Sequence, residues 1–182
     1  MLRLFVGIKI PDDITSELAA ISNGVPGARW VAPEDMHVTL RFIGDVDDDI
    51  AEDLDAALDA VDGHIFDLTL SGLGVFETRD RVRAVWADVR QEDALDALHA
   101  RVEAAIARAG QGHEKRKFVP HVTLARLKNV PVAQVQPYLQ LNGSVRFPPF
   151  TVDAFQLFRS HLGKSGARYE VLADYPLRSF DG

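Results

Sequence analysis

Two identical tetrapeptides carry the side chains with the clearest potential for chemistry. His37-Val38-Thr39-Leu40 recurs letter for letter as His121-Val122-Thr123-Leu124, 84 residues further along the chain. Each copy lies shortly after a proline, opens a segment that predicts a strand, and continues into an arginine. Two copies indicate two similar half-units and not a solenoid, which needs three or more repeats.

The side-chain period of a strand separates the polar and apolar residues of each tetrapeptide. His37 and Thr39 project from one face of the first strand, and His121 and Thr123 project from the matching face of the second. The valine and leucine of each copy project from the opposite face and anchor the strand. Packing the two half-units together therefore brings four polar side chains into one site.

Two imidazoles and two hydroxyls meet the demands of cyclic phosphodiester hydrolysis. A neutral imidazole takes a proton from the attacking water, while a protonated imidazole gives one to the departing ribose oxygen. Histidine suits both tasks because its ordinary pKa is about 6.5. The hydroxyls of Thr39 and Thr123 hydrogen-bond the non-bridging phosphate oxygens, whose charge grows in the transition state. The pattern predicts a phosphoesterase that uses no metal and no cofactor.

A zinc site is the rival use of two histidines. It needs three or four ligands at close spacing, and the sequence has neither a His-x-His pair nor a cysteine. Metal catalysis is therefore the less favoured alternative.

The apolar periodicity predicts strands and helices that alternate along the chain. Strands are expected at about 2–10, 36–43, 66–76, 81–89, 120–127, 151–159 and 168–177, and helices at about 11–23, 49–62, 91–109 and 132–141, with a loop at 161–166. Several strand pairs are joined by short turns, which favours an α+β fold with antiparallel sheets over a parallel doubly wound sheet. No linker separates the halves, so residues 1–182 are expected to form a single domain whose two lobes share an interface.

The charge distribution bears on the choice of partner. The net charge is −7, but residues 45–62 hold nine acidic residues and no Lys or Arg. The remaining 18 acidic and 20 basic residues are nearly balanced, so the rest of the molecule can still present a face that attracts phosphate. The absence of cysteine, of a signal peptide and of an apolar run of about 20 residues predicts a cytoplasmic protein with no membrane partner and no obligate protein partner.

The paired His-x-Thr-Leu motifs resemble those of the two-histidine (2H) phosphoesterase superfamily. Their surroundings resemble its bacterial RNA 2′,3′-cyclic phosphodiesterase branch, whose members are also called 2′-5′ RNA ligases. The resemblance extends over nearly the whole chain and is clearest at residues 3–8, 36–44, 85–86, 118–126 and 157–169. It implies a bilobal α+β fold with a pseudo-two-fold axis, helices outside and a central cleft. It also implies that His37 is the proton donor and His121 the proton acceptor.

Further residues are candidates for binding the substrate. Arg126 is expected to approach the phosphate, in line with the resemblance; the alternative is a salt bridge to the acidic helix. Residues 115–117 are all basic and either steer a polyanion or form a solvated loop. Aromatic side chains stack on unpaired nucleobases, and the candidates for this role, which include some that belong to the core, are Phe42, Trp86, Phe118 and Tyr169.

Three functions are consistent with these residues. The first is hydrolysis of 2′,3′-cyclic phosphates on RNA ends or nucleosides to 2′-phosphomonoesters. The second is the reverse reaction, 2′-5′ ligation of RNA at the same site. The third is an RNA-binding module without turnover, in which the histidines are dispensable.

Overall fold

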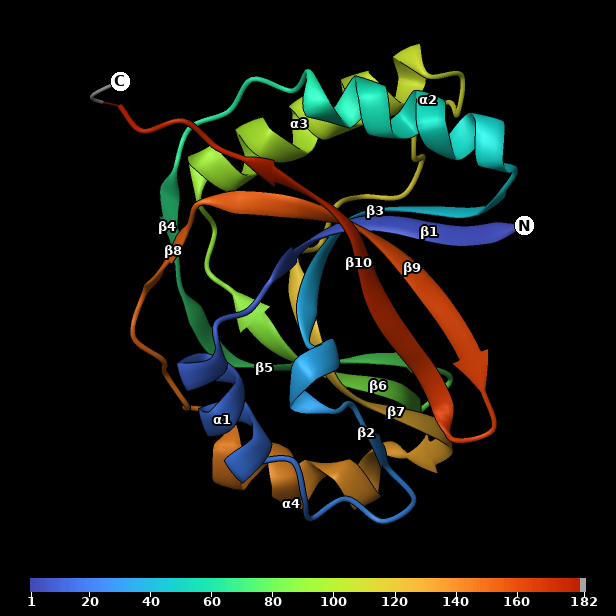
Figure 1. Ribbon diagram of the computed structural model, residues 1–182. Coiled ribbons are helices and arrows are strands. Elements are labelled where there is room, and N and C mark those ends of the chain that lie inside the picture. The colour runs from blue at the N-terminus through green and yellow to red at the C-terminus, as the bar shows by residue number, and fades with distance from the viewer. Residues whose placement is uncertain (181–182) are drawn as a thin grey trace.

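The computed structural model describes residues 1–180, and Figure 1 shows the arrangement of their helices and strands. The helices are α1 (Asp12–Ala20), the short 3-10 helix η1 (Pro33–Asp35), α2 (Asp48–Asp59), α3 (Asp93–Arg108) and α4 (Val132–Asn142). The strands are β1 (Leu2–Lys9), β2 (Arg29–Trp30), β3 (His37–Val46), β4 (Phe66–Leu68), β5 (Leu70–Thr78), β6 (Arg81–Val89), β7 (His121–Pro131), β8 (Phe150–Val152), β9 (Ala154–Gly163) and β10 (Gly166–Pro176).

The strands form one large sheet and one small sheet. The large sheet has the order β10-β9-β1-β3-β7-β6-β5, with β2 added to β7, while β4 and β8 pair separately. Every strand pair in both sheets is antiparallel. The prediction of an α+β fold with antiparallel sheets is confirmed.

The two tetrapeptide strands meet in the middle of the large sheet. β3 and β7 are joined by a single residue pair, Val38 and Val122, whose side chains are completely buried. On one side of this pair lie β10, β9 and β1, and on the other lie β6 and β5. The strands thus form one connected sheet with a narrow junction, and its division into two pseudo-symmetric lobes stays a prediction.

Helices cover the sheet from two sides. In Figure 1, α2 and α3 lie together at one end of the molecule, and α1 and α4 lie at the opposite end. The larger core includes Leu18 of α1, Leu54 of α2 and Val102 of α3, and a smaller cluster includes Val135 and Tyr138 of α4. The apolar residues of each helix therefore face the strands, as their spacing predicts.

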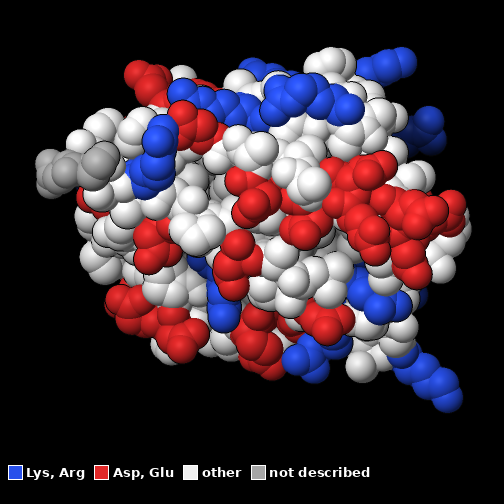
Figure 2. Space-filling view, turned by 45° about the horizontal axis from the view of Figure 1, so that its top comes forward, with Lys and Arg blue, Asp and Glu red and all other residues white. Residues whose placement is uncertain are grey.

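The acidic segment faces outward. Helix α2 buries Leu54 and Leu58, and its Asp and Glu side chains lie on the opposite, exposed face. Figure 2 shows acidic side chains gathered on the side of the molecule that carries this helix. The net negative charge is therefore concentrated on a surface that is separate from the sheet face described below.

Three predictions about the elements were wrong. The expected single strand at 151–159 is two strands that break at Asp153, because β8 pairs with β4 whereas β9 pairs with β1 and β10. The expected single strand at 66–76 is two strands that break at Thr69, because β4 pairs with β8 whereas β5 pairs with β6. The expected loop at 161–166 is mostly strand, because β9 and β10 remain paired as far as Gly163 and Gly166. In each case the partner strand, not the local pattern, sets the boundary.

The apolar periodicity of the sequence does not predict β2 and η1. A strand of two residues has no measurable periodicity, and β2 exists because Arg29 and Trp30 pair with Arg126 and Ala125 of β7.

Among residues 1–180, none of the helices is long and apolar enough to cross a membrane.

Candidate active site

The junction of β3 and β7 brings the two tetrapeptides together. With Val38 opposite Val122 in an antiparallel pair, His37 faces the position of Thr123, and Thr39 faces that of His121. The four polar side chains are partly exposed, whereas the valine and leucine of each copy are buried on the other face of the sheet. The structure thus brings His37, Thr39, His121 and Thr123 onto one face.

Each histidine is held by a backbone carbonyl two residues before it. The Nδ1 atom of His37 lies 2.8 Å from the Asp35 carbonyl oxygen, and that of His121 lies 2.7 Å from the Val119 carbonyl oxygen. A carbonyl only accepts, so Nδ1 carries the proton in both rings. The Nε2 atom of each neutral imidazole therefore carries no proton, and that of His37 accepts from the Thr39 hydroxyl at 3.0 Å.

A β-bulge follows both tetrapeptides. The pairing of β1 with β3 passes over Leu40, and the pairing of β6 with β7 passes over Leu124. An extra residue in a strand moves the following residues to the other face. Arg126 consequently lies on the same face as the histidines, and so does Phe42 at the corresponding position of β3.

A cavity of about 680 Å³ opens on this face. Its walls come from β1, β2, β3, β7 and the β9–β10 hairpin, and they include His37, Thr39, Arg126, Phe42 and Tyr169. His121 and Thr123 lie directly across the strand junction from the lining residues Thr39 and His37. The alternative role of Arg126, a salt bridge to the acidic helix, is not seen among residues 1–180.

Two of the four predicted aromatic residues lie beside the histidines, and a third, Phe42, lines the cavity. Tyr169 meets the His37 ring edge-on at a centroid distance of 5.0 Å, and Trp86 lies 5.6 Å from the His121 ring. Phe42 is 41% exposed, and the Arg3 guanidinium lies 5.0 Å from its centroid. Each of these rings is placed to contact a ligand or to support a histidine.

The prediction that Phe118 stacks on a base does not fit the structure. Its ring lies flat against the His99 ring of α3, at a centroid distance of 3.8 Å and an angle of 2°. Phe118 also packs against the larger core. The aromatic ring therefore anchors the segment that leads into β7 and does not line the cavity.

Burial and charge lower the pKa of both histidines. Burial against Phe5, Phe158 and Tyr169 is the main reason that the pKa of His37 falls from 6.5 to about 4, and the Asp35 carbonyl opposes this shift. The positive charge of Arg126 lowers it further. Burial also lowers the pKa of His121, with the Val119 carbonyl and the Asp88 carboxylate acting in the opposite direction. Both shifts favour the neutral form of the ring at pH 7.

Several residues of the site were not predicted from the sequence. Phe5 packs on His37 at 4.7 Å, and the buried Asp35 carboxylate accepts from the Arg168 guanidinium at 2.7 Å and from the Tyr169 backbone N–H at 3.2 Å. Asp35 thereby fixes the β10 segment that carries Tyr169 beside His37. The proximity of Asp35 to His37 in the sequence was the one available signal, because the partners of Asp35 lie more than a hundred residues away.

Comparisons with known proteins agree with this arrangement. A sequence model of the 2′-5′ RNA ligase superfamily matches residues 5–164. The chain belongs to this superfamily. Its relatives include the RNA 2′,3′-cyclic phosphodiesterase of Thermotoga maritima, which is 31% identical over 94% of this chain and 93% of the relative.

Solved structures show the same fold. A protein of Thermus thermophilus matches with a TM-score of 0.80 and 26% identity, over 98% of this chain and all of that one. Escherichia coli LigT in complex with 3′-AMP matches with a TM-score of 0.75 and 28% identity, over 97% of this chain and 98% of that one. Membership of the superfamily therefore rests on both sequence and structure.

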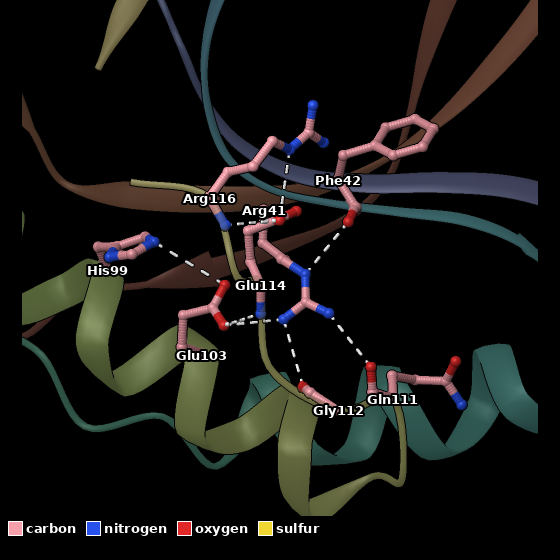
Figure 3. A network of polar contacts seen from close by, with 8 residues as sticks. All are labelled: Arg41, Phe42, His99, Glu103, Gln111, Gly112, Glu114 and Arg116. Atoms are coloured by element: carbon pink, nitrogen blue, oxygen red, sulfur yellow. Dashed lines mark hydrogen bonds and ion pairs between the residues drawn. The ribbon is translucent and has the colours of Figure 1, made fainter. Parts of the chain in front are cut away.

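This family member has a buried ionic network behind the first tetrapeptide (Figure 3). Arg41 is 8% exposed, and its guanidinium donates to Glu103 Oε2 of α3 at 2.8 Å. It also donates to the carbonyl oxygens of Gln111 at 3.1 Å, Gly112 at 3.3 Å and Phe42 at 3.2 Å. Arg41 thus connects β3 to helix α3 and to the segment that follows it.

The bulges explain why Arg41 is buried whereas Arg126 is exposed. Arg41 is the first residue after its tetrapeptide, and the corresponding residue after the second tetrapeptide is the buried Ala125. Arg126 is the second residue after its tetrapeptide, and the corresponding residue after the first is Phe42. The segment 111–120 runs from the Arg41 network past the Phe118–His99 stack to the carbonyl that holds His121. Arg41 therefore supports the second histidine from behind the first motif.

Removal of the Arg41 charge is expected to destabilise the fold. In Arg41→Met, the largely buried Glu103 carboxylate loses its guanidinium partner and keeps only the Glu114 N–H and the His99 ring, and three carbonyls lose a donor. The free energy of unfolding should fall by about 3 kcal/mol. Arg41→Met/Glu103→Leu should be more stable than the single variant, because the carboxylate without its guanidinium partner is then removed as well. Urea denaturation measures both. Arg108→Met, at an exposed position of α3, is the control and should change stability by less than about 0.5 kcal/mol; equal stability of Arg41→Met and wild type would contradict the network's role.

The lowered pKa of His37 predicts a loss of stability in acid. The unfolded chain protonates this imidazole below about pH 6.5, whereas the folded chain does so only near pH 4. Between these values the unfolded state binds more protons, so stability falls as the pH falls, by about 2 kcal/mol between pH 7 and pH 5 for this group. His37→Asn should remove that part of the decline. Urea titrations of both proteins at several pH values measure it, and parallel curves would rule out the shift.

Proposed function

We propose that the protein hydrolyses the 2′,3′-cyclic phosphodiester ends of RNA to 2′-phosphomonoesters by general acid-base catalysis. The observation that carries the proposal is the pair of imidazoles at the β3–β7 junction, each with Nδ1 bound to a carbonyl and Nε2 available for proton transfer. Several relatives of similar length are named RNA 2′,3′-cyclic phosphodiesterases, which supports this choice of substrate.

In the proposed reaction His121 is the proton acceptor and His37 the proton donor. Water attacks the phosphorus and gives a proton to His121 Nε2, while the bond from phosphorus to the ribose O3′ breaks and O3′ takes a proton from His37 Nε2. The products are a 2′-phosphomonoester and a free 3′-hydroxyl. Exchange with solvent then returns a proton to His37 and removes one from His121.

Arg126, Thr39 and Thr123 bind the phosphate in this scheme. A guanidinium and two hydroxyls match the non-bridging oxygens, on which negative charge accumulates in the transition state. The bound anion also has a second effect. It offsets the repulsion from Arg126 that lowers the pKa of His37, so substrate binding favours the protonated form that a donor must have.

The aromatic residues have two proposed tasks. Phe42 and Tyr169 line the cavity and offer rings to the base of the terminal nucleotide. Trp86 lies beside His121 and rests on Gly74, where a Cβ atom would overlap its ring. Trp86 is therefore assigned to the support of His121 in preference to base stacking.

Product analysis in the presence of a chelator tests the function. With a nucleoside 2′,3′-cyclic phosphate and excess EDTA, we expect the 2′-monophosphate as product at an undiminished rate, because the acid, the base and the phosphate ligands are all side chains. Loss of activity with EDTA and its recovery with zinc would contradict the mechanism. Formation of 2′-5′-linked RNA from two RNA ends would show ligation at this site, and binding of RNA without turnover would show a binding module.

Removal of either imidazole is expected to lower turnover. His37→Ala and His121→Ala should each reduce kcat by roughly 10²–10⁴-fold, the usual contribution of a positioned acid or base. The double variant should be little worse than the poorer single variant, because the two groups act as a unit. Steady-state kinetics measures these effects, with circular dichroism as the check on folding.

The pH profiles of the same variants test the two roles. A donor must be protonated, so His37→Ala should flatten the fall in rate at high pH. An acceptor must be neutral, so His121→Ala should flatten the fall at low pH. The opposite result would exchange the roles, and full activity of either folded variant would remove that histidine from the mechanism.

A further inference from the structure

Two arginines lie opposite each other at the edge of the cavity. Arg29 of β2 pairs in register with Arg126 of β7, and both side chains are exposed and line the cavity. Directly opposite residues of an antiparallel pair project from the same face, with their Cβ atoms about 4.5–5.5 Å apart. The two arginine side chains therefore extend side by side into the cavity.

The charges of this pair are not balanced by carboxylates. The other arginines of the cavity have partners: Arg168 binds Asp35 at 2.7 Å, and Arg3 lies 3.7 Å from Asp45. Within residues 1–180, no carboxylate lies within 4.0 Å of the guanidinium of Arg29 or Arg126. Asp35 is the one acidic residue in the cavity wall, and Arg168 and the Tyr169 N–H already bind it.

Two like charges directly opposite each other destabilise a sheet. A bound anion would offset the repulsion between the two arginines, so their position indicates a site for an anionic ligand. One phosphate at Arg126 accounts for one of the two charges. Arg29 is also supported in place, because its side chain runs along Gly166 at the β9–β10 turn, where a Cβ atom would lie 3.4 Å from the Arg29 Cδ. The second guanidinium is therefore held over the cavity with no phosphate yet assigned to it.

We infer that Arg29 binds the internucleotide phosphate on the 5′ side of the terminal nucleotide, while Arg126 binds the cyclic phosphate. The inference rests on the proposed function. A 2′,3′-cyclic phosphate closes the 3′ end of a chain, so the next phosphate lies on the 5′ side, one ribose away. Adjacent guanidinium groups on neighbouring strands match adjacent phosphates of one nucleotide. The site thus selects ends of RNA chains over free nucleoside cyclic phosphates.

The experiment compares two substrates that differ only in the 5′-phosphate. At constant ionic strength, the kcat/KM of wild type should be about 10-fold higher for a nucleoside 5′-phosphate 2′,3′-cyclic phosphate than for the nucleoside 2′,3′-cyclic phosphate, the value of one charge-assisted contact. Arg29→Gln should bring the ratio to about 1, and Arg29→Lys should retain part of it. Arg108→Gln, which removes an equal charge from an exposed position of α3, should keep the wild-type ratio.

A binding measurement separates failure of this inference from failure of the proposed function. Calorimetry should give wild type a Kd for adenosine 2′,5′-bisphosphate about 10-fold lower than for adenosine 2′-phosphate, and Arg29→Gln should abolish the difference. Absence of hydrolysis with this binding pattern intact would reject the function and retain the Arg29 subsite. Hydrolysis without any preference, or a preference that survives Arg29→Gln, would overturn the subsite and retain the function.

Discussion

The antiparallel pair of Val38 and Val122 is the contact on which the site depends. It is the one backbone pairing between β3 and β7, and both side chains are completely buried. An antiparallel pair has a local two-fold axis, so the identical residues that flank each valine are placed symmetrically around it. The same register that buries two valines beneath the sheet places two histidines and two threonines above it. A slip by one residue would turn the polar groups into the core.

Local geometry then prepares both histidines for proton transfer. Each imidazole is fixed by a backbone carbonyl two residues before it. The distance from Nδ1 to the carbonyl oxygen is 2.8 Å for His37 and 2.7 Å for His121. This contact selects the tautomer in which Nε2 carries no proton. Burial acts against the charged form and lowers the pKa of both groups. The positive charge of Arg126 adds to the effect of burial at His37, so we propose that an anion bound at Arg126 raises the proton affinity of His37.

β3 and β7 each have a bulge at the same position after the tetrapeptide, but different residues follow it. After Thr39, the bulge turns Arg41 inward, where it joins Glu103 and the carbonyls of the segment behind the second motif. After Thr123, it turns the small Ala125 inward and presents Arg126 to the cavity. β3 therefore contributes a structural cation, whereas β7 presents to the cavity the arginine that we propose as the phosphate ligand. No residue of α2 lines the cavity, whose wall holds four arginines and a single acidic residue, Asp35.

The sequence by itself determined the alternation of elements, the antiparallel α+β class and the residues of the site's centre. These follow from the apolar periodicity and from a repeated tetrapeptide whose alternation fixes which side chains share a face. Information that is local in sequence was sufficient for them. The break at Thr69 and the two-residue β2 could not be predicted in this way, because each depends on a partner strand far along the chain.

Only the tertiary structure decided the neighbours of the two motifs. The bulges after Leu40 and Leu124 arise from pairing with β1 and β6, and they alone direct Arg41 into the core and Arg126 into the cavity. The stacking of Phe118 on His99, the link from Asp35 to Arg168 and the pairing of Arg29 with Arg126 likewise join residues from separate elements. A one-dimensional pattern shows which face a residue prefers, whereas the register between distant strands sets which groups meet there.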